Sequence, residues 1–115
     1  MRARILDIYA KYGDYIKEII PLKIEDEYMK IVIHLLDGTS LRVTEEWDGD
    51  KLVHYSYYWL TPDNQLKIGW DNSPHHRKLE TFPHHKHVAR QADRQPSFET
   101  CLEEVMEVII SELSA

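Results

Sequence analysis

One short segment of the 115-residue chain holds five of its seven histidines, together with a carboxylate and an amide. The segment consists of two runs within eighteen positions, Trp70–His76 and Thr81–His87. Imidazole titrates near neutral pH, so histidines can accept and donate protons in catalysis, and they are also common metal ligands. Chance does not readily bring so many of these groups together. We therefore expect the chemistry of this protein to reside in this segment.

One chemistry that fits these groups is cleavage of an RNA phosphodiester bond. The reaction needs a base that takes the 2′-hydroxyl proton, an acid that protonates the leaving 5′-oxygen, and cations that hold the phosphate. A pair of histidines suits the first two tasks, and Arg77, Lys86 and Arg90 suit the third. Asp71, at the end of a predicted strand, is placed to orient an imidazole and fix its tautomer.

A second chemistry is metal binding. In an extended segment His85 and His87 project on the same face, and His75 or His76 could complete a site with Asp71. The alternative metal site is therefore Asp71, His76, His85 and His87, with Zn²⁺ or another divalent metal as the cofactor. The spacing matches no specific zinc motif such as His-Glu-x-x-His, and the sequence favours the reaction without a metal or other cofactor.

Other residues of similar types are assigned to the scaffold. His34 and His54 lie within strand patterns and are interpreted as structural. One predicted strand carries aromatic residues that could stack on bases: Tyr55, Tyr57, Tyr58 and Trp59. Alternating aromatics in a sheet covered by helices are more typical of a core, and we predict that role for them. Cys101 is interpreted as a small buried residue on the apolar face of the last helix.

Charge and composition limit the classes of protein to consider. The net charge is −6, which disfavours non-specific attraction to nucleic acid or to an anionic membrane. The segment His75–Arg94 is an exception, because five Lys and Arg face two acidic residues there, a local net charge of +3. No apolar stretch approaches the roughly 20 residues that span a bilayer, and no signal-peptide core follows Met1. We expect a cytoplasmic protein. A single cysteine excludes an internal disulfide framework.

The periodicity of apolar residues predicts an α+β fold formed by one domain over residues 1–115. An N-terminal helix is expected from about residue 2 to about 19, ended by Pro21, and a C-terminal helix from about 98 with Ser97 as its N-cap. Between them, alternation and turn residues predict a four-stranded antiparallel meander at 28–36, 41–47, 52–60 and 65–71. The remaining residues, 72–97, form a His-rich loop that could include one short strand at about 85–89.

The same two runs carry a resemblance to a known family. Trp70–His76 and Thr81–Val88 resemble the Asp-Asn-Ala-Pro-His-His and Phe-Pro-His-His-Lys-His runs of the TumE-type family of small prokaryotic proteins. Gly38 matches the family's turn glycine after the first strand, and residues 55–59 match its Tyr-x-Tyr-x-Trp strand. Ser73 replaces the more common alanine, a change between two small residues. The resemblance extends from about residue 5 to about 110.

The resemblance implies the toxin component of a type II toxin–antitoxin pair, neutralised by a cognate antitoxin. Because many small toxins of such pairs cleave RNA, we expect a metal-independent ribonuclease, with RNA free or on the ribosome as its substrate. The expected catalytic residues are Asp71, His75, His84, His85 and His87. The expected substrate-binding residues are Asn72, Arg77, Lys86 and Arg90. Two alternatives stay open, a metal-dependent hydrolase or nuclease and a non-catalytic binding module. The sequence also leaves homodimerisation open.

Overall fold

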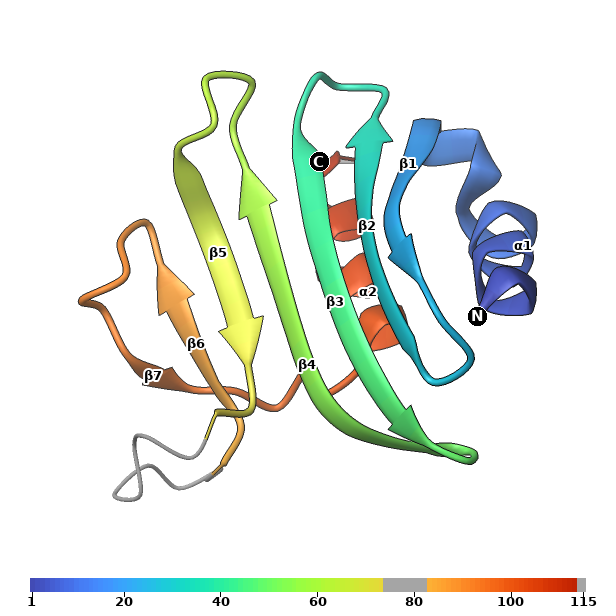
Figure 1. Ribbon diagram of the computed structural model, residues 1–115. Coiled ribbons are helices and arrows are strands. Elements are labelled where there is room, and N and C mark those ends of the chain that lie inside the picture. Colours follow the sequence, from blue (N-terminus) through green and yellow to red (C-terminus); the bar gives the residue numbers. More distant parts are fainter. Residues whose placement is uncertain (74–82, 114–115) are drawn as a thin grey trace.

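The computed structural model describes residues 1–73 and 83–113. Over these residues the chain forms an antiparallel sheet of seven strands with two α-helices and one 3-10 turn (Figure 1). The helical elements are α1 (Arg2–Tyr12), η1 (Gly13–Tyr15) and α2 (Leu102–Leu113). The strands are β1 (Ile16–Ile24), β2 (Tyr28–Leu35), β3 (Ser40–Asp48), β4 (Lys51–Leu60), β5 (Leu66–Asp71), β6 (His85–Val88) and β7 (Gln95–Pro96). The predicted α+β fold is confirmed.

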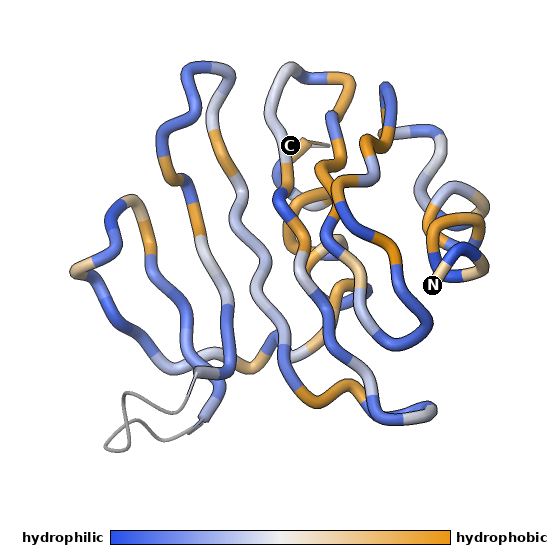
Figure 2. Tube along the Cα trace, in the orientation of Figure 1, coloured by the Kyte–Doolittle hydropathy of each residue, from blue (hydrophilic) through white to orange (hydrophobic). Residues whose placement is uncertain are grey.

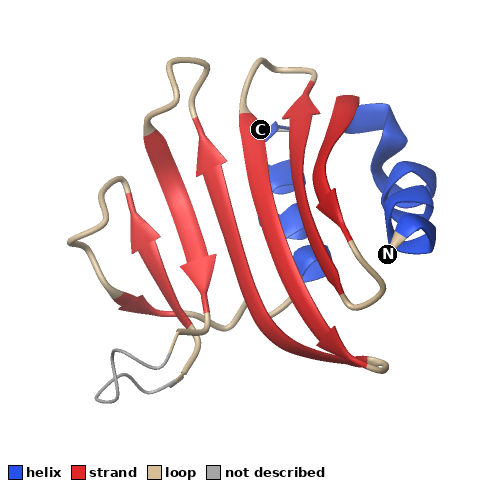
Figure 3. Ribbon diagram, viewed as in Figure 1, coloured by secondary structure: helices blue, strands red, loops and turns tan. Residues whose placement is uncertain are grey.

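The sheet is a meander in which every strand pairs with the next along the chain. Helix α2 lies behind β2 and β3 in the view of Figure 1, and α1 lies beside β1 at one edge (Figures 1 and 3). One face of the sheet is therefore covered by α2, and the other carries no helix among the described elements. We call this second surface the open face.

The alternation of apolar and polar residues assigns side chains to the two faces. Four register partners across β2 to β5 are fully buried: Ile31, Val43, Tyr57 and Trp70. Together with Leu102, Val105, Met106 and Ile109 of α2 they form the core on the covered face. Along β2 and β3 in Figure 2, hydrophobic and hydrophilic stretches follow one another as this alternation requires. The predicted core role is confirmed for Tyr55, Tyr57 and Trp59.

The N-terminal helix is shorter than predicted. It ends at Tyr12, and the residues expected in its second half form η1 and the edge strand β1. The apolar spacing of residues 12–20 is compatible with either structure, and the β-branched residues Ile16, Ile19 and Ile20 favour the strand that pairs with β2. Pro21 lies inside this strand, where an edge position tolerates a residue that has no backbone N–H.

The edge strand is protected by α1. The Tyr9 hydroxyl accepts a hydrogen bond from the backbone N–H of Ile19 at 2.8 Å. Helix α1 is held to the rest of the molecule by Arg4, whose guanidinium contacts Glu45 on β3 in a bidentate pair at 2.6 and 2.9 Å. Arg4 also pairs with Glu103 of α2 at 2.8 Å. One arginine thus links α1, the covered face of the sheet and α2.

The C-terminal helix begins at Leu102, four residues later than predicted, and Ser97 is not its N-cap. The Ser97 hydroxyl donates to the carbonyl of Glu99, and Phe98, before the helix, is 67% exposed. The Glu104 carboxylate accepts hydrogen bonds from the backbone N–H and the hydroxyl of Thr100, which closes the first turn. This backbone hydrogen bond lowers the pKa of Glu104.

The meander is confirmed within one residue at each end, as is the short strand at about 85–89, which is β6. The sheet has seven strands in place of the four plus one expected, because β1 and β7 were not predicted. The two-residue β7 pairs His85 with Pro96 and Lys86 with Gln95. A strand this short leaves no periodic signal in the sequence.

Candidate functional site

The candidate site lies where β5 ends beside β6. Asp71 is the last residue of β5, and its register partner is His85, the first residue of β6. Gly69 is the partner of His87 in the same pair of strands. Partners in an antiparallel pair share a face, so Asp71, His85 and His87 lie together on the open face, opposite Trp70 and the core.

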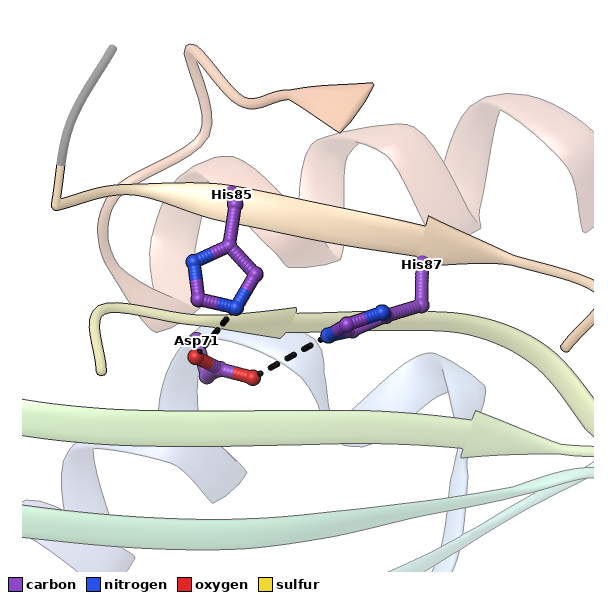
Figure 4. Close-up of side chains that lie close together, drawn as sticks. All are labelled: Asp71, His85 and His87. Carbon is purple, nitrogen blue, oxygen red and sulfur yellow. Dashed lines mark ion pairs between the residues drawn. The ribbon is translucent and has the colours of Figure 1, made fainter. Parts of the chain in front are cut away.

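Both imidazoles point at one carboxylate (Figure 4). His85 Nε2 lies 2.7 Å from Asp71 Oδ1, and His87 Nε2 lies 3.4 Å from Asp71 Oδ2. The two rings meet edge to face with centroids 5.0 Å apart. All three side chains are at least nine-tenths buried. A buried carboxylate requires pairing, and here it is supplied by the two histidines.

The second nitrogen of each imidazole contacts a backbone carbonyl. His85 Nδ1 lies 3.1 Å from the carbonyl oxygen of Pro83, and His87 Nδ1 lies 3.0 Å from that of Asp93. A carbonyl can only accept a hydrogen bond, so each Nδ1 must carry its proton, and each Nε2 is the atom that faces Asp71. Both rings are thereby fixed in orientation, with each Nε2 atom directed at an oxygen of Asp71.

Asp71 has further contacts from its own side of the sheet. Its Oδ1 accepts the backbone N–H of Ser73 at 3.0 Å, and its Oδ2 lies 3.3 Å from the Tyr58 hydroxyl. Burial raises the pKa of Tyr58, and the negative charge of Asp71 raises it further, so this phenol stays protonated as a donor. The side chain of Gln91 also hydrogen-bonds to Tyr58.

A cavity of about 370 Å³ opens on this group. Its lining consists of Tyr58, Asp71, Ser73, His85, His87, Gln91 and Arg94. Arg94 is exposed and brings a positive charge to the cavity, beside two imidazoles that can exchange protons. A cavity of this size with convergent polar groups is typical of a ligand-binding or active site.

Comparison with known families matches residues 12–114 to the family model described as Toxin TumE. The match covers nearly the whole chain. This chain belongs to the TumE toxin family. Membership implies a toxin of a toxin–antitoxin system, with an antitoxin as its partner. Neither curated proteins nor solved structures gave a match. No helix among residues 1–73 and 83–113 is long and apolar enough to cross a membrane.

In this TumE-family chain the residues of the predicted site separate into groups. Asp71, His85 and His87 come together as described above. His75, His76 and Arg77, predicted as catalytic, metal-binding and substrate-binding residues, lie outside the described residues. The catalytic role of His75, the metal-binding role of His76 and the substrate-binding role of Arg77 remain predictions.

His84 is placed apart from the cluster. Its Nδ1 lies 2.9 Å from the Tyr55 hydroxyl, and its ring stacks on Tyr55 at a centroid distance of 5.8 Å. Tyr55 belongs to the core on the covered face, whereas His85 and His87 are on the open face. Burial lowers the pKa of His84, and the neighbouring His85 lowers it further. His84 therefore favours the neutral form, and its catalytic role stays a prediction.

The predicted substrate-binding residues that the structure describes also lie away from the cavity lining. Lys86 is the register partner of Trp70, so it lies on the covered face, where its Nζ is 3.6 Å from Glu99. The amide of Asn72 bridges backbone groups of β4, accepting from Tyr55 N–H and donating to the Val53 carbonyl, each at 2.9 Å. Arg90 is exposed in the segment after β6.

Sequence reasoning missed four residues that line the cavity, Tyr58, Ser73, Gln91 and Arg94. Tyr58 was assigned to the core, but it faces the open side between the buried residues Tyr57 and Trp59. The alternation of β4 contained this signal, because neighbouring strand residues point to opposite faces. Cys101 also differs from the prediction, because it precedes α2 and is partly exposed, with its thiol 3.5 Å from Glu104.

Proposed function

We propose that this toxin inhibits growth by cleaving RNA at the cluster of Asp71, His85 and His87. The observation that carries the proposal is the pair of oriented imidazoles, whose Nε2 atoms flank the two oxygens of one buried carboxylate beside a cavity. General acid and base catalysis needs two such groups within reach of one reacting phosphate. Membership of a toxin family agrees with an activity that damages an essential polymer.

In the proposed reaction the Nε2 atom of one imidazole exchanges its contact with Asp71 for one with the substrate and takes the 2′-hydroxyl proton. The 2′-oxygen forms a bond to phosphorus, and the bond from phosphorus to the 5′-oxygen breaks. The second imidazole delivers a proton to the departing 5′-oxygen, which leaves a 2′,3′-cyclic phosphate and a 5′-hydroxyl. Asp71 orients both rings, and Arg94 at the cavity stabilises the charge on the phosphate.

A metal centre is the second candidate, and one observation favours it. Histidines that bind metals commonly donate the other ring N–H to a backbone carbonyl, as both histidines do here. The three ligand atoms of Asp71, His85 and His87 lie within 4.8 Å of one another. These donors suit Zn²⁺ or another divalent ion, which would polarise the phosphate and activate a water. The same three residues then act as ligands.

The test is cleavage of total RNA and of ribosome-bound mRNA by the purified protein, with and without EDTA. The variant is the double substitution His85→Ala, His87→Ala, and the matched control is His34→Ala, His54→Ala, which removes two histidines outside the cavity lining. Cleavage that survives EDTA, disappears in the first variant and persists in the control supports the metal-free reaction. Cleavage that EDTA abolishes supports the metal centre. A toxin that arrests growth without cleaving any RNA contradicts the proposal and favours a binding module.

The antitoxin offers an independent check. An antitoxin that neutralises this chemistry by covering the site should protect the cluster from solvent. Hydrogen exchange of the toxin, alone and with the antitoxin encoded beside it, should then show added protection in β5 and β6.

A further inference from the structure

The open face continues from the candidate site across the sheet. One row of register partners runs from His85 and Asp71 through Ser56 and Thr44 to Lys30 on β2. The neighbouring row runs from His87 and Gly69 through Tyr58 and Arg42 to Val32. Three strand spacings separate Lys30 from Asp71, roughly 14 Å across the sheet. The site and these residues therefore share one continuous surface.

A second hollow lies on this surface. It has a volume of about 240 Å³, and its lining includes Leu22, Lys30, Val32, Arg42 and Thr44. Arg42 lines this hollow, and its register partner Tyr58 lines the cavity at the candidate site. The two hollows thus adjoin across the Arg42 and Tyr58 pair. We call the two hollows, with the Arg42 and Tyr58 pair between them, the open-face track.

The track carries positive charge that described residues do not neutralise. Lys30 and Arg42 are exposed, and neither forms an ion pair within residues 1–73 and 83–113. Arg94, which lines the cavity at the site, is also exposed and forms no ion pair with the described residues. The opposite side of the molecule is acidic, because α2 contains four glutamates and no lysine or arginine. In a chain of net charge −6, this asymmetry directs an anionic partner to the open face.

We propose that the open-face track binds single-stranded RNA, with Lys30 and Arg42 on its phosphates and the strand running from β2 to the cluster of Asp71, His85 and His87. The proposal rests on the proposed function and names where its substrate lies. Sheet surfaces that combine cations with an aromatic side chain suit single strands, whose unstacked bases contact the rings. Tyr58 supplies such a ring between Arg42 and the site.

Binding is measured with a fluorescent single-stranded oligonucleotide that is 2′-O-methylated at every sugar, so that it lacks the attacking hydroxyl. The variant is Lys30→Gln, Arg42→Gln. The matched control is Lys11→Gln, Lys51→Gln, which removes the same charge from α1 and from the first residue of β4. Circular dichroism and urea unfolding confirm that each variant folds. Anisotropy titrations at several salt concentrations give the affinity and its salt dependence.

We expect the Lys30→Gln, Arg42→Gln variant to bind at least tenfold more weakly than the control. Its slope of log affinity against log salt should be shallower by about 1.4, since each phosphate contact on a single strand contributes about 0.7. Wild-type protein that does not bind the oligonucleotide, or equal losses in variant and control, overturns the track. A second readout separates the two proposals. Binding by a wild-type protein that cleaves no RNA rejects the proposed function alone, and cleavage that Lys30→Gln, Arg42→Gln leaves unchanged rejects the track alone.

Discussion

The ring of Tyr58 lies so close to Gly69 that a β-carbon at position 69 would be 2.4 Å from the ring carbon Cδ1. The two residues are register partners on the open face. Because Gly69 has no side chain, the ring can lie across β5, and its hydroxyl reaches Asp71 at 3.3 Å. The glycine therefore helps to position a hydrogen-bond donor at the candidate site.

Gly69→Ala should displace the Tyr58 ring. We expect a loss of stability of about 1–3 kcal/mol, as is typical of an added carbon in a packed position, together with reduced RNA cleavage. The matched control is Gly13→Ala, since a β-carbon there meets nothing within 4 Å and the backbone is helical. That change should be neutral or stabilising by about 0.4–1 kcal/mol. Urea unfolding and cleavage assays measure both. A Gly69→Ala protein as stable and active as the wild type would show that the close approach has no role.

The ion pair of Arg4 and Glu45 provides a prediction for stability. Glu45 is fully buried and accepts hydrogen bonds from Arg4, from the Tyr57 hydroxyl at 2.6 Å and from Trp47 Nε1 at 3.1 Å. Burial disfavours the charge on Arg4, but the hydrogen bonds and charge of Glu45 outweigh this and raise the pKa of Arg4.

Arg4→Met should lower the free energy of unfolding by about 3–5 kcal/mol, because it leaves the Glu45 carboxylate buried without its cation. Arg2→Met on the exposed side of the same helix should change stability by less than about 0.5 kcal/mol. Urea unfolding compares the two variants. The double variant Arg4→Met, Glu45→Gln should recover part of the loss, and a double variant no more stable than Arg4→Met would contradict the assigned pairing.

Most strands of the sheet could be predicted from the sequence, but its first strand could not. Alternation and turn residues gave the meander from 28 to 71, because each turn follows a strand of the expected length. The strand at 16–24 was not predicted, because the spacing of Ile16, Ile19 and Ile20 fits a helix equally well and only pairing with β2 decides between the two. Local patterns do not contain that long-range information.

The site was predicted in its residue types more than in its geometry. Asp71, His85 and His87 stood out because period-two spacing places the two histidines on one face. That the two histidines share a face with Asp71 follows from the register of β5 and β6. The same register places Lys86 on the covered face. Arg94 and Gln91 come from a segment without periodicity. Their approach to the cavity follows from β7, a strand too short to predict.

His84 gives a prediction for the pH dependence of stability. Burial and the neighbouring His85 lower its pKa in the folded protein below the ordinary value of 6.5. Between the two pKa values the unfolded chain binds more protons than the folded one, so stability falls as the pH drops below about 6.5.

His84→Gln should remove this contribution. The wild type should then lose more stability than the variant between pH 7.5 and pH 5.5, as measured by urea unfolding at both values. The other histidines remain in both proteins, so the difference between the two proteins isolates His84. An equal loss in wild type and variant would show that His84 is not the group responsible.

The two candidate chemistries make opposite predictions for metal binding. If Asp71, His85 and His87 bind a divalent ion, purified protein should bind Zn²⁺ in competition with a chromophoric chelator, and bound metal should raise the melting temperature. Asp71→Asn should weaken that binding at least tenfold, since it replaces a carboxylate that contacts both imidazoles with a neutral amide. Asp93→Asn is the matched control, because only the backbone carbonyl of Asp93 contacts His87.

For a metal-free ribonuclease, by contrast, EDTA and added Zn²⁺ should leave the melting temperature unchanged. Asp71→Asn should then reduce cleavage by disturbing the orientation of the two rings, so that kcat falls while KM changes little.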